Sequence, residues 1–158
     1  MKLADLVVPD AIITDLGSSS RDEVIAELLD ALASAGTIDR ALRDELLASV
    51  LEREQKGSTG FGKGVAVPHV KHSSTQRMAA AIGLSKGGVD FNALDKQPVY
   101  SVFLLLSPAD KPEEHLQAME VIFKNLSKDT FRRFLRQAST REDVLTLLDE
   151  ADAQQFSA

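Results

Sequence analysis

The sequence predicts an α/β fold, a single sheet flanked by helices on both faces. Apolar residues recur at helical spacing in several stretches, and short apolar stretches typical of strands alternate with them. One stretch, VYSVFLLL over 99–106, is apolar at nearly every position, as in a strand buried on both faces. This alternation around an apolar central strand favours a layered α/β structure.

Length and composition indicate one ordinary globular domain. The chain has 158 residues, of which 44% are apolar and 27% charged, a mixture that fills a core. The expected domain covers 1–158, with a core over about 3–150 and a loose tail over 153–158. No internal repeat or linker is visible.

Charge and cysteine content exclude several function classes. The net charge of −6 disfavours nonspecific nucleic-acid binding, and the absence of cysteine excludes disulfides and thiol catalysis. No apolar run approaches the roughly 20 residues of a membrane-spanning helix, so no membrane insertion is expected. Asp5, Pro9 and Asp10 interrupt the start where a signal peptide would be apolar. We expect a soluble, cytoplasmic protein.

The first third of the chain predicts a strand and two helices. AIITDL over 11–16 is a short strand. A capping box of the S-x-x-E type begins at Ser20 and starts a helix that runs to about Ala35. A second helix is expected over 39–56.

The remainder predicts three strands followed by helices. The strands are expected over 65–67, where Pro68 stops the first, over 77–85 and over 99–107. Pro112 suits the first turn of the next helix. Further helices are expected over 129–138 and 139–151, the last starting at a Ser139/Glu142 capping box.

The segment REQKGSTGFGKGVAVPHVKH, residues 53–72, contains a sequence close to a nucleotide-binding P-loop, Gly57-x-x-x-x-Gly62-Lys63. A P-loop requires Ser or Thr after the lysine to bind Mg²⁺, and here Gly64 follows. It also joins a strand to a helix, whereas the order predicted here is helix, loop, strand. A P-loop-like nucleotide-binding protein therefore remains only as an alternative.

The same residues suit a phosphate without a metal. Consecutive amides around glycines form anion-binding nests, which points to Gly60 and its neighbours. Ser58 and Thr59 add hydroxyl donors, and Arg53 adds a planar guanidinium for phosphate oxygens. The segment leads to His69, and neutral imidazole is a nucleophile. We therefore expect the phosphate to become attached to His69 itself.

Two other interpretations of the histidines stay open. A histidine after an apolar strand also serves in packing, and His115 could be an exposed residue at a helix start. His69, His72 and His115 could alternatively bind a metal ion, although no carboxylate accompanies them in a recognisable ligand pattern. The preferred interpretation needs neither metal nor cofactor.

REQKGSTGFGKGVAVPH resembles the phosphorylation-site signature of the fructose/mannitol-type enzyme IIA domains of the phosphoenolpyruvate-dependent sugar phosphotransferase system and their nitrogen-regulatory relatives. VDFNALDKQPVYSVFLLLSPADKPEEHLQAM, over 89–119, resembles a second block of that family. The resemblance covers about residues 3–150. It implies a mixed five-stranded sheet flanked by helices.

The resemblance also implies roles. His69 would be the phosphorylated histidine and would receive its phosphoryl group from a histidine-phosphorylated carrier resembling HPr; sugar-specific members pass it to a IIB domain. His115 would be the second, unphosphorylated histidine, and Arg53 the arginine beside the phosphate. The opening LADLVVPDAIITDLG resembles the nitrogen-regulatory branch and no IIB or IIC sequence is attached, so we expect a regulatory target protein as partner. Sugar uptake is the alternative.

Three positions depart from the family pattern: Phe61, Lys63 and Val70. The lysines Lys63 and Lys71 are expected to meet acidic groups on a partner or to be plain solvated surface. The apolar residues near His69 are expected either to form a docking rim or to pack in the core. They are Phe61, Val65, Val67 and Val70.

Overall fold

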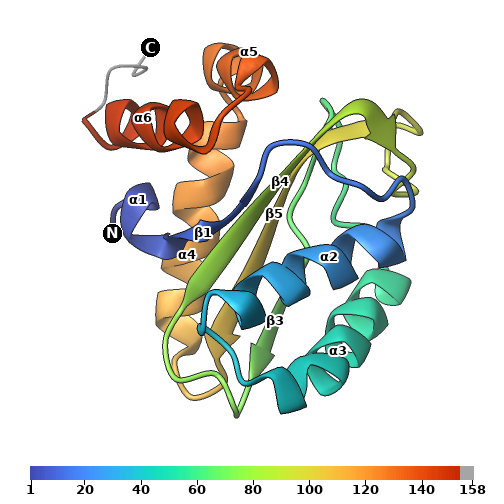
Figure 1. The fold of residues 1–158 in the computed structure, drawn as a ribbon, viewed down its shortest axis with the longest axis vertical. Helices are drawn as coiled ribbons and strands as arrows, with labels where there is room; N and C mark the ends of the chain where they lie inside the picture. The colour runs from blue at the N-terminus through green and yellow to red at the C-terminus, as the bar shows by residue number, and fades with distance from the viewer. Residues whose placement is uncertain (154–158) are drawn as a thin grey trace.

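A computed structural model describes residues 1–153 as one sheet between two layers of helices (Figure 1). The helices are α1 (Leu3–Leu6), α2 (Arg21–Ser34), α3 (Arg43–Lys56), α4 (Pro112–Leu126), α5 (Asp129–Gln137) and α6 (Arg141–Asp152), with a short 3₁₀ turn, η1 (Arg40–Leu42). The strands are β1 (Val7–Ile13), β2 (Val65–Ala66), β3 (His69–His72), β4 (Ala79–Val89) and β5 (Val99–Pro108).

The sheet is five-stranded and mixed, which confirms the expected fold class. Its order is β1-β4-β5-β2, and β3 pairs with β5 beyond the end of β2. Only β4 and β5 are antiparallel; β1, β2 and β3 each lie parallel to their neighbour. Strand β5 therefore bonds to three other strands and forms the centre of the sheet.

Side chains of β5 alternate between two hydrophobic cores, one on each face of the sheet. Phe103 and Leu105 pack with α4, α5 and α6, and Leu104 and Leu106 pack with α2 and α3. All four side chains are fully buried. The prediction that this strand is buried on both faces is confirmed.

Strand β3 was not predicted, because the sequence suggested that Pro68 ends the extended segment. Proline lacks an N–H, so the ladder is interrupted there. The Pro68 carbonyl nevertheless accepts a hydrogen bond from Leu105 N at 3.0 Å, and the chain then rejoins β5 at His69. In place of the single expected strand over 65–67, the chain forms β2, which is two residues long, and then β3.

Several predicted boundaries shift. Strand β1 starts at Val7, four residues before the expected position, and the 3₁₀ turn η1 precedes α3 where one continuous helix over 39–56 was predicted. Ser20 is the N-cap residue of α2, but its side chain accepts no capping hydrogen bond, so the predicted capping box there is wrong.

The capping box of α6 lies one residue after the predicted Ser139/Glu142 pair. The Thr140 hydroxyl accepts from Asp143 N at 3.0 Å, and the Asp143 carboxylate accepts from Thr140 N at 3.2 Å. The local sequence is compatible with a capping box that starts at Ser139 or at Thr140. The folded structure uses the Thr140 register.

Within the described part of the chain, no helix combines the length and apolar character that a bilayer span requires. Of the tail predicted over 153–158, only Ala153 belongs to the described residues, and 154–158 lie outside them.

We predict that Thr140→Ala lowers the free energy of unfolding by about 1 kcal/mol, because the amide of Asp143 loses its acceptor. Ser139→Ala is the matched control and should change stability by less than about 0.5 kcal/mol. Urea unfolding followed by circular dichroism measures both. Equal losses for the two variants would contradict the assignment of Thr140 as the cap.

Candidate phosphorylation site

Two histidines from distant parts of the chain lie beside each other. His69 begins β3. His115 lies in the first turn of α4, where its backbone N–H donates to Lys111 O. Their ring centroids are 5.5 Å apart at an interplanar angle of 45°. His69 is half-buried, and His115 is only 8% exposed. The alternative of an exposed histidine at a helix start is therefore wrong for His115.

One backbone carbonyl determines the protonation of His69. Its Nδ1 lies 2.8 Å from the carbonyl oxygen of Val67. A carbonyl oxygen only accepts hydrogen bonds, so Nδ1 carries the proton and donates. In the neutral ring, Nε2 then has a free lone pair, which is the requirement for a nucleophilic nitrogen.

Burial keeps both rings neutral at neutral pH. It is the largest cause of the lowered pKa of His69; the hydrogen bond to Val67 opposes this shift, and the positive charge of Arg53 adds to it. Burial, assisted by repulsion from His69 and Lys71, lowers the pKa of His115 from 6.5 to about 4. The site is therefore arranged for an uncharged imidazole pair.

Ser107 holds the second ring in place. His115 Nδ1 lies 2.7 Å from the Ser107 hydroxyl, and Ser107 is fully buried at the end of β5. In the parallel pairing of β3 and β5, His69 is opposite Leu105 and Lys71 is opposite Ser107. The same strand thus positions both histidines, one through its ladder and one through a side chain.

Arg53 approaches the site from the last turn of α3. Its Nη1 donates to Gly57 O at 2.9 Å, which ties the guanidinium to the first residue of the glycine-rich loop. Its charge contributes to the lowered pKa of His69. Three elements, α3, β3 and α4, therefore bring together charges that influence one another: Arg53 acts on His69, and His69 acts on His115.

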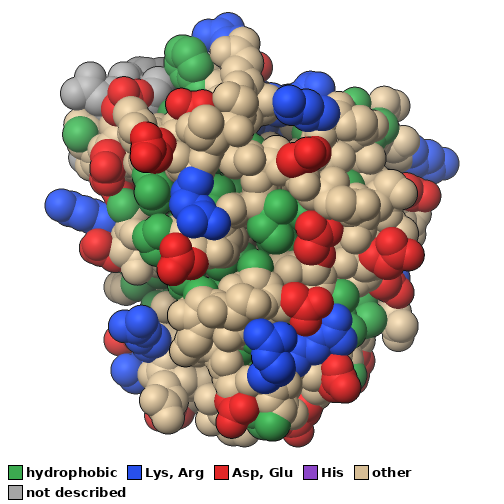
Figure 2. Space-filling model, in the orientation of Figure 1, with side chains coloured by type: hydrophobic (Ala, Val, Ile, Leu, Met, Phe, Trp, Pro, Cys, Tyr) green, Lys and Arg blue, Asp and Glu red, His purple; other side chains and the backbone are tan. Residues whose placement is uncertain are grey.

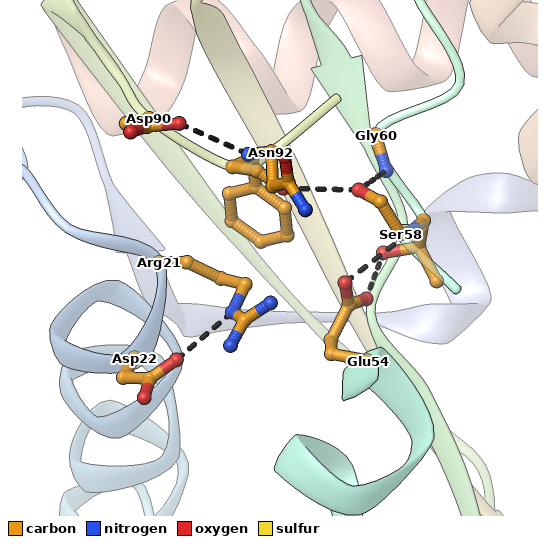
Figure 3. A network of polar contacts seen from close by, with 9 residues as sticks. Arg21, Asp22, Glu54, Ser58, Gly60, Asp90 and Asn92 are labelled. Carbon is orange, nitrogen blue, oxygen red and sulfur yellow. Dashed lines mark hydrogen bonds and ion pairs between the residues drawn. The ribbon is translucent and has the colours of Figure 1, made fainter. Parts of the chain in front are cut away.

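The loop residues expected to face a phosphate are bonded within the protein. The Ser58 hydroxyl donates to Phe91 O at 2.9 Å and accepts from Gly60 N at 3.0 Å. Thr59 donates to the Glu54 carboxylate through both its N–H, at 3.2 Å, and its hydroxyl. Figure 3 shows Glu54 bonded to this loop, with Ser58 directed toward Gly60 and toward the segment at Asn92.

Sequence reasoning missed the two buried polar residues that support the site. Glu54 is 2% exposed and anchors the loop through Thr59. Ser107 ends the apolar run of β5, and that polar ending was the one signal that could have singled it out. Nothing in the sequence around Glu54 distinguished it from a solvated helix residue.

The four apolar residues near His69 all pack on a hydrophobic core, Val65 and Val67 fully and Phe61 and Val70 in part. Val65 and Val67 are buried in the core, so they do not form a docking rim. Phe61 is half-buried against the Phe123 ring, at a centroid distance of 4.9 Å, and Val70 is also half-buried. Lys63 and Lys71 are exposed.

Neither alternative chemistry finds support in the geometry. Within residues 1–153, no three His, Asp or Glu side chains are grouped closely enough to hold a metal ion. His72 faces α3, where its Nε2 lies 3.5 Å from Glu45, and not the pair of His69 and His115. The glycine-rich loop joins helix α3 to strand β2, the reverse of the order in a P-loop.

Comparison with known proteins places this arrangement in a family. Residues 5–151 match the family model described as "Phosphoenolpyruvate-dependent sugar phosphotransferase system, EIIA 2". The chain belongs to this family. It is therefore a phosphotransfer protein of the phosphotransferase system, and the resemblance seen in the sequence is confirmed.

Its relatives in the EIIA family include both regulatory and sugar-specific proteins. A nitrogen regulatory protein of Bradyrhizobium diazoefficiens is 32% identical over 149 residues, which are 94% of this chain and 95% of the relative. The fructose-specific EIIABC component of Bacillus subtilis is 31% identical over 152 residues. The match covers 96% of this chain but only 24% of that longer protein.

The solved structure of a nitrogen regulatory protein has the same fold as this chain. The nitrogen regulatory protein IIA-Ntr of Neisseria meningitidis superimposes with a TM-score of 0.83 at 27% identity. The superposition covers 92% of this chain and 98% of that one. The EIIA fold therefore extends over nearly the whole described chain.

We predict that His115 makes the protein less stable in acid. Between pH 6.5 and about 4, His115 of the unfolded chain binds a proton that the folded protein excludes. Stability therefore falls as pH decreases through this window. In His115→Gln that contribution is absent, so the loss of unfolding free energy between about pH 7 and about pH 5 should be smaller. A ring titration of His115 by NMR with its midpoint near 6.5 would contradict this prediction.

Proposed function

We propose that His69 Nε2 accepts a phosphoryl group from a histidine-phosphorylated carrier protein resembling HPr. The observation that carries this proposal is the hydrogen bond from Nδ1 to the Val67 carbonyl, which leaves Nε2 as the free nitrogen. In the transfer, the donor's N–P bond breaks and its nitrogen recovers the electron pair. A bond forms from Nε2 to phosphorus, and no proton is exchanged.

Arg53 and His115 would stabilise the transferred group. Phosphoryl transfer depends mainly on positioning and on stabilising charge over the three equatorial oxygens. The guanidinium of Arg53 supplies permanent positive charge beside His69. His115 is bonded to Ser107 through Nδ1, so its Nε2 is the nitrogen that would meet an oxygen of a phosphoryl group on His69.

Ser58, Thr59 and Gly60 would act indirectly. Their side chains and amides brace the loop against Glu54 and Phe91. This bracing holds the carbonyl of Gly57, the acceptor of Arg53, in a defined position. Direct bonds from these three residues to a phosphate, as expected from the sequence, would require these contacts to open.

A nitrogen-regulatory role is the function supported best. The regulatory relative from B. diazoefficiens matches over almost the full length of both chains, and the N. meningitidis structure superimposes with a TM-score of 0.83. In this role, phosphorylation of His69 would change the affinity for a target protein. The second candidate is sugar uptake by transfer to a IIB domain, which the likeness to the fructose-specific protein of B. subtilis favours.

We predict that incubation with phosphoenolpyruvate, enzyme I and HPr adds one acid-labile phosphoryl group to the wild-type protein. His69→Gln should accept none, because Nε2 of the imidazole is lost. His72→Gln removes another imidazole from the same strand and should be labelled like the wild type. Label that persists in His69→Gln would show that a different residue is phosphorylated.

The two roles separate in a second transfer experiment. We predict that the phosphorylated protein, mixed with the IIB domains of its own cell, retains its label, because the regulatory role needs no onward transfer. Radiolabel on the IIB domain measures the alternative. Rapid transfer to any one IIB domain would assign the protein to sugar uptake.

A further inference from the structure

Positive charge gathers around α5, away from the histidine pair. A hollow of about 670 Å³ is present there. It is lined by Lys63, Asp129, Arg132, Arg133, Arg136 and Gln137. Four of these six residues are cationic, in a chain whose net charge is −6. Figure 2 shows Lys and Arg side chains at the top of the molecule, the end at which Figure 1 places α5.

Helical spacing separates the two faces of α5. Phe131 and Leu135 are fully buried and attach the helix to the core. Arg133 and Arg136, three residues apart, are exposed on the side away from the core, and Arg132 lies between the two faces and is half-buried. The helix therefore presents a guanidinium-rich wall on a rigid support.

The other wall is the glycine-rich loop. Lys63 has a φ of 61° between two glycines that also have positive φ, and its N–H donates to Asp95 Oδ2 at 3.2 Å. The next residue, Gly64, accepts hydrogen bonds from Tyr100 and Ser101 at the start of β5. Lys63, the lysine of the P-loop-like sequence, therefore lies beside α5.

Most of these cations have no counter-charge. Arg132 is bonded to Leu126 O at 2.8 Å and to Asp129 at 3.3 Å. Within the described chain, no carboxylate pairs with Lys63, Arg133 or Arg136.

Both unpaired guanidinium groups of the hollow lie over aromatic rings. That of Arg136 stacks on the Tyr100 ring, 3.7 Å from its centroid, and that of Arg133 lies 5.6 Å from the centroid of Phe134. A ring face attracts a cation without neutralising it. The hollow thus keeps several positive charges close together, and their repulsion would be relieved by a bound anion.

We propose that this hollow binds a small polyanion that carries two or more linked phosphate groups. Guanidinium forks match phosphate oxygens, and a lysine opposite them adds a point charge. The cations lie on two walls of a concave site, so a ligand with several negative groups contacts both walls, whereas a single phosphate contacts one. No P-loop geometry and no metal ion is needed.

The proposed site is separate from the histidine pair. Tyr100, under Arg136, lies five residues before Leu105, the β5 partner of His69. At about 3.3 Å per residue, the two places are roughly 16 Å apart along the strand. The proposal therefore assigns a second ligand to the protein, beyond the phosphoryl group on His69.

Inorganic tripolyphosphate is the probe for this site, and isothermal titration calorimetry at low salt is the measurement. We expect one binding site whose affinity falls as NaCl is added. Combining Lys63→Gln with Arg133→Gln should weaken binding by about tenfold or more, because two charge-assisted contacts are lost. Within residues 1–153 neither side chain makes a hydrogen bond, and Arg133 contacts only the exposed Phe134 ring at long range, so the variant should unfold nearly like the wild type.

Two control variants test whether tripolyphosphate binds in the hollow and not elsewhere on the protein. Lys2→Gln with Arg77→Gln removes the same charges elsewhere and should change affinity by less than about twofold. His69→Gln should bind like the wild type. Absence of binding, an equal loss in the charge control, or a loss in His69→Gln would each overturn the proposal. Tighter binding of a poly-glutamate peptide than of tripolyphosphate would also overturn it, in favour of an acidic protein partner.

Discussion

The site depends on the hydrogen bond between His69 and the carbonyl of Val67. That bond selects the tautomer, and the tautomer decides which nitrogen can be a nucleophile. It forms because Pro68 interrupts the edge of the sheet and the chain re-enters the ladder at His69, which brings the imidazole back over a carbonyl two residues earlier. The proline that ends one strand therefore helps to set the tautomer of His69.

Strand β5 is the support on which the two histidines meet. Its side chains are buried on both faces, so its position is determined by two cores at once. Leu105 sets the place of His69 through the ladder, and Ser107 sets the orientation of His115 through its hydroxyl. Because both supports belong to one strand that is packed on both faces, the distance between the rings is set by the close-packed interior.

Positive charge is concentrated at two places in this acidic protein. Near His69 the charge comes from Arg53, whose side chain is held by Gly57 O, and burial keeps the imidazoles themselves neutral. Around α5, Arg133 and Arg136 lie on the exposed side of an amphipathic helix and line the hollow together with Arg132 and Lys63. The glycine-rich loop reaches both places, since Gly57 lies at one end and Lys63 near the other.

The sequence by itself determined the fold class, most helices and the central strand, because periodicity is a local property of the chain. It also suggested His69, His115 and Arg53 as site residues, through the glycine-rich segment and the family resemblance. Only the tertiary structure decided that β3 exists, that His115 is buried against Ser107 and that Thr140 caps α6. It also showed that Ser58, Thr59 and Gly60 are bonded within the protein. These features depend on hydrogen-bond partners that become neighbours only when the chain folds, such as Phe91 for Ser58, and no local pattern encodes them.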